Sequence, residues 1–142
     1  MAYATLGNLK SRLGRFFEEL YIVSHGEPKE DWAACDLEDS AAEIDAALAA
    51  RYAVPVSATG SIPLVKAWNL ALAEELAWSR GGRDTIPANV KERAKSMRDQ
   101  LAQVAKGVYG LPGAAGRAEA AGAAIDATAA TPVFTRDKLS GW

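Results

Sequence analysis

The side chains that most often carry catalysis are scarce in this chain of 142 residues. The sequence holds one histidine, His25, and one cysteine, Cys35. His25 stands beside a glycine, which predicts a surface loop, whereas Cys35 falls in a helical pattern and is expected to be a small core or boundary residue. A single histidine and a single cysteine supply neither a nucleophile with its base nor a zinc ligand set. The sequence therefore predicts a protein that is not an enzyme, with no catalytic residue, metal or cofactor.

Two adjacent carboxylates, Glu74 and Glu75, are a further candidate for acid–base chemistry. Neighbouring residues of a helix point in different directions, so we expect each of them to be exposed or ion-paired. The pair Gly81-Gly82 lacks the Lys-Ser/Thr that follows the glycines of a phosphate-binding loop. These residues therefore predict no active site and no nucleotide site.

Charge is distributed unevenly along the chain, although the formal net charge is only −2. Residues 27–45 hold eight carboxylates and a single lysine, whereas residues 80–106 hold seven basic and three acidic residues. An acidic half and a basic half can attract within one molecule or head-to-tail between copies, or the basic half can face a polyanion. Three basic residues share one face of a predicted helix: Lys91, Lys95 and Arg98. With no exposed aromatics between them, they would contact DNA phosphates without reading bases.

Apolar spacing of three and four residues predicts an all-α fold, a small bundle of about four helices. We expect helices over residues 5–20, with Thr5 as N-cap, over 32–52, with an interruption or a bend near 36–40, over 61–78 and over 90–108. The third is apolar on nearly every side and is predicted to be central. No series with a period of two residues precedes Pro132, so no strand is predicted there.

The glycines and proline at 110–113 are expected to end the helical domain, giving a domain over residues 1–110 and an Ala/Gly-rich tether with a docking segment over 111–142. An Ala/Gly tract has too little apolar area to offset its ordering entropy, which predicts an extended tail. The tail nevertheless ends with large apolar side chains that favour binding to another protein: Val133, Phe134, Leu139 and Trp142. No apolar run reaches the roughly 18 residues of a membrane span and no signal peptide is recognisable, so we expect no membrane partner.

Three segments together carry a resemblance to a known family: residues 3–6 with Leu9 and Phe16, residues 40–55, and residues 133–142. In their order and spacing they resemble the Mu-like branch of the tailed-phage head-tail connector, or neck adaptor, proteins. The resemblance implies a small helical protein that assembles as a ring beneath the portal and provides the surface on which the stopper or tail docks. The chain departs from the family in its long Ala/Gly tract.

The resemblance also implies partners and a location. The expected partners are further copies in a homo-oligomeric ring, expected to be a dodecamer, the portal protein, a stopper or tail-terminator protein, and passing double-stranded DNA bound without sequence specificity. The expected location is the neck, at the head-tail junction, of a phage virion or of a phage-derived particle, after assembly in the host cytoplasm. The tail would dock on the portal or on a neighbouring subunit through Val133, Phe134, Arg136, Leu139 and Trp142.

The basic residues are open to two interpretations. Lys91, Lys95 and Arg98 would face either a neighbouring subunit or the DNA. Arg51 would either complement the dipole at the C-terminal end of its own helix or form an ion pair with an acidic residue of the same or the next subunit. The alternative function is a small helical module that binds the DNA phosphate backbone through the basic fourth helix.

Overall fold

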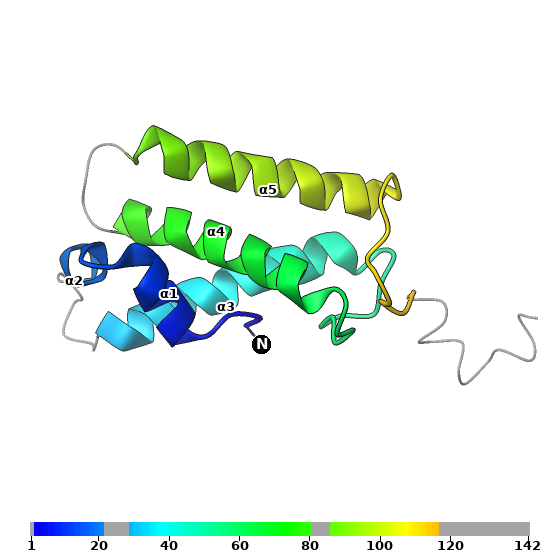
Figure 1. The fold of residues 1–142 in the computed structure, drawn as a ribbon, viewed down its shortest axis with the longest axis horizontal. Helices are drawn as coiled ribbons and strands as arrows, with labels where there is room; N and C mark the ends of the chain where they lie inside the picture. The colour runs from blue at the N-terminus through cyan, green and yellow to red at the C-terminus, as the bar shows by residue number, and fades with distance from the viewer. Residues whose placement is uncertain (1, 22–28, 81–85, 117–142) are drawn as a thin grey trace, which may run out of the picture.

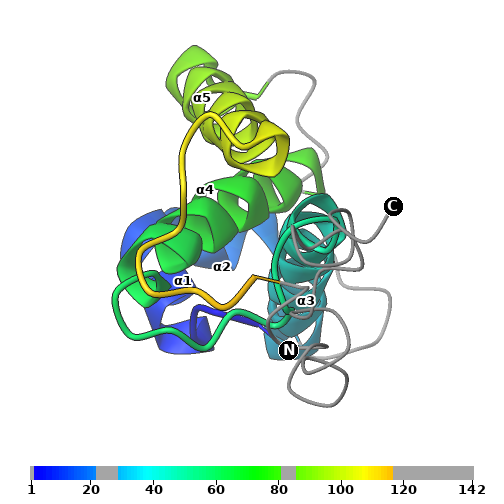
Figure 2. The same cartoon turned by 90° about the vertical axis from the view of Figure 1, so that its right-hand side faces the viewer.

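The structure, a computed structural model, describes residues 2–21, 29–80 and 86–116. These ranges form five helices and no strand: α1 Leu6–Leu13, α2 Phe16–Leu20, α3 Lys29–Leu48, α4 Ile62–Arg80 and α5 Ala88–Lys106. The helices pack as a small bundle, which confirms the predicted all-α class (Figures 1 and 2). None of the helices in these ranges is both long and apolar enough to span a bilayer.

Helix α4 is the centre of the bundle, as its apolar sequence predicts. It contacts each of the other four helices. In the end-on view, α5 lies on one side of α4 and α1 on the other, while α3 flanks α4 and also contacts α5 (Figure 2). Leu72 and Trp68 of α4 are almost fully buried, and so is the polar Asn69. A helix covered on several sides in this way organises the packing of all the others.

The first predicted helix is divided in two. Thr5 caps α1 as expected, because its Oγ1 accepts a hydrogen bond from the Asn8 backbone N–H at 3.2 Å and its own N–H donates to Asn8 Oδ1 at 3.0 Å. Gly14, with a φ of 57°, ends α1 and donates its N–H to the Lys10 carbonyl. The prediction of one helix over residues 5–20 is therefore wrong, since a glycine at positive φ turns the chain before α2 begins.

The second predicted helix, α3, runs without the expected interruption near residues 36–40. The buried polar side chains of this stretch all have hydrogen-bond partners. Ser40 Oγ donates to the Asp36 carbonyl of the same helix at 2.8 Å, and the Asp36 carboxylate accepts from Tyr21 and Arg80. The predicted interruption is therefore wrong, since these tertiary partners satisfy the polar groups within a continuous helix.

Helix α5 ends earlier than its apolar spacing predicts. Gly107 adopts a left-handed conformation, with a φ of 87°, and donates its N–H to the carbonyls of Gln103 and Val104. The prediction that carried the helix to Val108 is wrong, because this cap turns the chain out of the helix first. Val108 and Tyr109 consequently leave the buried face of α5.

Beyond α5 the chain folds back onto the bundle. Leu111 is buried and donates its N–H to the Tyr52 hydroxyl at 3.1 Å, while Ser61 Oγ donates to the Pro112 carbonyl at 2.5 Å. Ala53 N–H donates to the Ala115 carbonyl at 3.1 Å. The division of domains at residue 110 stays a prediction, and residues 111–116 lie against the helices.

Candidate functional site

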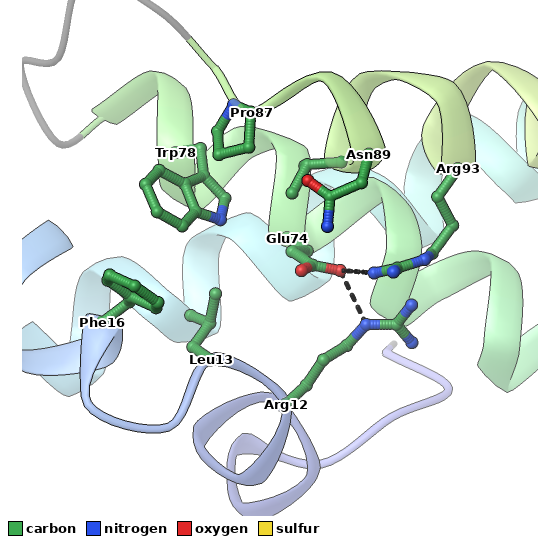
Figure 3. Close-up of a pocket in the computed structure, with 9 residues that line it drawn as sticks. Arg12, Leu13, Phe16, Glu74, Trp78, Pro87, Asn89 and Arg93 are labelled. Carbon is green, nitrogen blue, oxygen red and sulfur yellow. Dashed lines mark hydrogen bonds and ion pairs between the residues drawn. The ribbon is translucent and has the colours of Figure 1, made fainter.

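A groove opens between α1, α4 and α5, with a volume of about 820 Å³. Its floor at one end is Glu74 of the central helix, flanked by Arg12 of α1 and Arg93 of α5 (Figure 3). Glu74 Oε2 accepts from Arg12 Nε at 2.7 Å and from Arg93 Nη1 at 2.8 Å. One largely buried carboxylate oxygen thus joins three helices.

The other end of the groove is apolar. Phe16, Leu13 and Trp78 gather there (Figure 3), and the Phe16 and Trp78 rings lie 5.0 Å apart between centroids at an interplanar angle of 50°. Tilted aromatic pairs at this separation stabilise packing. The groove therefore has an aromatic wall at one end and, at the other end, a carboxylate that is ion-paired to two arginines.

The predicted basic face of α5 is only partly directed at solvent. Lys91 and Lys95 are exposed. Arg98 instead donates through Nε to Glu43 of α3 at 2.8 Å and through Nη1 to Glu75 of α4 at 2.8 Å. These bonds raise the pKa of the Arg98 guanidinium, with the Glu43 contact as the largest cause. The acidic and basic halves of the chain thus pair in part within one molecule, through Arg98 and Glu43. This was one of the alternatives that the sequence left open.

A second link between the acidic and basic halves is buried. Asp36 of α3 is 1% exposed, accepts from the Tyr21 hydroxyl at 2.7 Å, and faces Arg80 of α4, whose Nη2 lies 2.7 Å from Oδ1. The Arg80 guanidinium also stacks on the Trp32 ring, 4.4 Å from its centroid. The hydrogen bond to Asp36 raises the pKa of Arg80, whereas burial first, and then Asp36, raise the pKa of Tyr21. The cluster ties α2, α3 and α4 together.

The structure also places the remaining candidates from the sequence. Glu74 and Glu75 are both ion-paired, as expected. Cys35 is exposed, so the prediction of a core or boundary residue is wrong, because position 35 faces away from the buried stripe that Ala33 and Leu37 form on α3. No group of three or more potential metal ligands occurs in the described part of the chain. His25 lies outside it.

Arg51 lies in the turn after α3, with its guanidinium against Gly107: a Cβ added to that glycine would lie 2.0 Å from Nη1. This contact places a cation at the C-terminal end of α5, where a helix dipole favours positive charge. An ion pair of Arg51 between subunits stays a prediction. The docking segment lies outside the described residues: Val133, Phe134, Arg136, Leu139 and Trp142.

Several residues of this network were not foreseen from the sequence. Arg12 and Arg93 meet at Glu74, and Asn69 of α4 is fully buried, accepting from the Tyr3 and Ala4 backbone N–H groups at 3.0 and 2.8 Å. The Asn69 amide donates to the Leu37 carbonyl at 3.0 Å and to Ser40 Oγ at 2.7 Å. The sequence feature that could have indicated these contacts is a single asparagine in an otherwise apolar helix. A buried asparagine side chain requires hydrogen-bond partners.

Comparison with known protein families gives a match. The family model described as "Bacteriophage Mu, Gp36" matches residues 3–128, which include all five helices. No curated protein matches the chain.

Proposed function

The chain belongs to the bacteriophage Mu Gp36 family and is thus a phage protein of the Mu-like type, and we propose that it is a structural adaptor at the head-tail junction of the virion. In this role it forms a ring beneath the portal and bridges the portal to the stopper or tail. The observation that carries the proposal is the family match over residues 3–128. The resemblance of residues 3–6, 40–55 and 133–142 to neck adaptors supports the finer assignment.

The internal contacts of the bundle suit a subunit that bears load. Glu74 joins α1, α4 and α5, and Arg98 joins α5 to α3 and α4. Asp36 adds the buried link between α3 and α4. Each exposed ion pair contributes little, but charges that share partners in a network restrain the helices relative to one another. A stiff subunit is what a joint between head and tail requires.

The proposed partners follow from the same role. They are further copies of the chain in a ring, expected to be a dodecamer, together with the portal, the stopper or tail-terminator, and DNA that passes through the channel. Residues 133–142 dock on the portal or on a neighbouring subunit. Repetition around a ring converts modest contacts into a stable joint, because each additional contact forms at a high effective concentration.

Electron microscopy of the purified chain mixed with the portal of the same phage tests the proposal. We expect an additional ring of density on the tail-facing side of the portal. A matched sample of the chain lacking residues 131–142 tests the tail: its circular dichroism should match that of the full chain, while the additional ring is lost. Intact portals without added density in the full-length sample would overturn the adaptor assignment.

The alternative function, a module that binds the DNA phosphate backbone, is favoured by one observation. Lys91 and Lys95 are both exposed and lie four residues apart on α5. The test measures binding to double-stranded DNA by fluorescence anisotropy at low and moderate salt. A DNA-binding module would show binding that weakens steeply with salt and is lost in the Lys91→Ala/Lys95→Ala variant but retained in Lys66→Ala. An adaptor that lets DNA pass would bind weakly in all three.

A further inference from the structure

Two apolar side chains stand exposed immediately after α5. Val108 is 59% exposed and Tyr109 is 63% exposed, and they are the large hydrophobic residues of the described ranges that remain exposed. The left-handed Gly107 directs them away from the core face that Leu101 and Val104 occupy. We refer to Val108 and Tyr109 as the knob. An exposed aromatic beside an exposed aliphatic residue is typical of a surface that binds another protein.

Positive charge flanks the knob. Lys106, the last residue of α5, is exposed, and the Arg51 guanidinium lies against Gly107. The knob is therefore an apolar tip with cations at its base.

An apolar pocket of about 350 Å³ lies near the start of the chain. Its lining includes Tyr3, Pro55, Val56 and Ile62, together with the exposed Ser57. The Val56 backbone N–H donates to the Tyr3 hydroxyl at 2.9 Å, which joins the N-terminal segment to the loop before α4. The pocket is thus built from two segments that a hydrogen bond holds together.

Negative charge flanks the pocket. The Tyr3 hydroxyl donates to the Asp45 carboxylate, and the Ala2 N–H donates to Glu38 Oε1 at 3.2 Å. Both carboxylates belong to α3, and Glu38 is exposed while Asp45 is partly exposed. The charge around the pocket is therefore opposite to the charge around the knob.

The knob and the pocket lie on different sides of the bundle. The segment after α5 starts, in yellow, on the upper side of Figure 1 and then runs down toward the lower side, whereas the N-terminal segment is on the lower side. The end-on view in Figure 2 agrees. Helix α4 lies between the two sides. A knob in one copy can therefore meet the pocket of another copy, which leaves each copy with a second surface for a further neighbour. A contact of this kind closes into a ring or extends as a filament.

We propose that the knob of one copy, Val108 and Tyr109, inserts into the pocket at Tyr3, Pro55, Val56 and Ile62 of the next copy, with Lys106 and Arg51 facing Glu38 and Asp45 across the contact. The inference rests on the proposed function, because it names the surfaces by which the subunits of the ring join. The occupant is a second copy of this chain, since the same molecule presents both complementary parts.

Disulfide cross-linking with single cysteines tests this head-to-tail contact. In a Cys35→Ser background, Gly110→Cys places a thiol next to an intact knob, where an added Cβ meets only the Tyr52 hydroxyl at 3.8 Å. Ser57→Cys places a thiol at an exposed position in the lining of the pocket. The two variants carry different tags and are mixed, with portal present to template a ring, and then oxidised.

We expect a mixed dimer of Gly110→Cys with Ser57→Cys, far weaker products from either variant alone, and a ladder of oligomers when both cysteines are in one chain. Ser79→Cys, exposed on α4, is the matched control and should give no mixed dimer with Gly110→Cys. Cross-linking no stronger than in this control would overturn the inference. A cross-link from Ser57→Cys to Trp142→Cys instead would show that the tail occupies the pocket, which also overturns it.

A second measurement removes the knob itself. Both residues are exposed, so Val108→Ser/Tyr109→Ser should keep the circular dichroism spectrum of the parent. We measure the association constant between copies by sedimentation, with portal present to template the ring. We expect this constant to fall roughly tenfold or more, as for loss of a buried aromatic anchor. Gln103→Ala, at the same end of α5, should leave the association constant unchanged. An unchanged association constant would contradict the proposal.

The two hypotheses fail in different ways. Rings on the portal without the specific cross-link would retain the adaptor function and overturn the knob contact. The specific cross-link without any ring on the portal would retain the contact and overturn the adaptor function.

Discussion

Arg80, the last residue of α4, binds Asp36 in the middle of α3, with Nη2 2.7 Å from Oδ1. The Asp36 carboxylate is buried, and the Tyr21 hydroxyl donates to its other oxygen at 2.7 Å. One carboxylate from the acidic half of the chain thereby holds one arginine from the basic half. The resulting link orients α3 and α4, which make up much of the bundle's core.

Removing this carboxylate should destabilise the fold. In Asp36→Ala the buried Tyr21 hydroxyl loses its acceptor, which costs about 1–3 kcal/mol, while Arg80 is exposed enough to turn toward water. We expect the free energy of unfolding, measured with urea, to fall by roughly 2 kcal/mol. Asp39→Ala, at an exposed position of the same helix, should change it by less than about 0.5 kcal/mol. Equal effects of the two substitutions would contradict the structural role of Asp36.

Stability should fall in alkaline solution because of two tyrosines. The pKa of Tyr21 and of Tyr3 is raised above the ordinary 10.0, in both cases by burial first and then by a carboxylate, Asp36 or Asp45. Above about pH 10 the unfolded chain releases these protons while the folded chain keeps them, so the free energy of unfolding decreases as pH rises. The slope is up to about 1.4 kcal/mol per pH unit for each group.

The measurement is the free energy of unfolding between about pH 9 and 11. The Tyr3→Phe/Tyr21→Phe variant should lose less stability over this interval than the parent, since phenylalanine has no proton to release. Tyr109→Phe, at the exposed knob, should follow the parent. A double variant with the same alkaline loss as the parent would exclude these two tyrosines as its cause.

Asn69 should be essential for holding the start of the chain. Asn69→Ala leaves the Tyr3 and Ala4 N–H groups and the Leu37 carbonyl without this partner. With buried groups costing about 1–3 kcal/mol each, we expect a loss of roughly 3 kcal/mol or more in the free energy of unfolding. Hydrogen exchange at the Tyr3 and Ala4 amides should accelerate as well. Asn89→Ala, exposed at the start of α5, is the control and should alter neither quantity.

Gly107→Ala should destabilise the end of α5 for two separable reasons. A left-handed backbone costs an L residue about 1–2 kcal/mol, and the new Cβ would lie 2.0 Å from Arg51 Nη1. We expect a smaller loss of thermal stability for the same substitution in an Arg51→Ala background, because only the backbone part of the cost remains. Identical losses in both backgrounds would show that the guanidinium does not pack on Gly107.

A glycine elsewhere provides the control for this pair. Gly7→Ala lies in α1 with no positive φ, and its Cβ would meet only Thr5 Oγ1 at 3.7 Å. Since alanine is the better helix former, the melting temperature should stay unchanged or rise.

The features that the sequence predicted correctly are local ones. The Thr5 cap depends on a residue three positions away, and the burial of α4 follows from apolar residues on nearly all of its sides. Glu74 and Glu75 were expected to be exposed or ion-paired and are ion-paired, whereas their partners were not predicted. The exposure of Lys91 and Lys95 follows from their helical spacing opposite the apolar stripe of α5. Each of these features depends on residues within one or two helical turns, and the spacing of residues along the sequence shows such neighbours directly.

The contacts that define the candidate site depend on the tertiary structure. Arg80 meets Asp36 across 44 residues, Arg98 meets Glu43 across 55, and Asn69 meets Tyr3 across 66. The sequence determined that the chain has an acidic half and a basic half, but many different pairs of acidic and basic residues were compatible with that distribution. Only the packing of α3 and α5 against α4 decided among them, because charge pairs form at distances of a few Å and the relative placement of helices sets which side chains come that close.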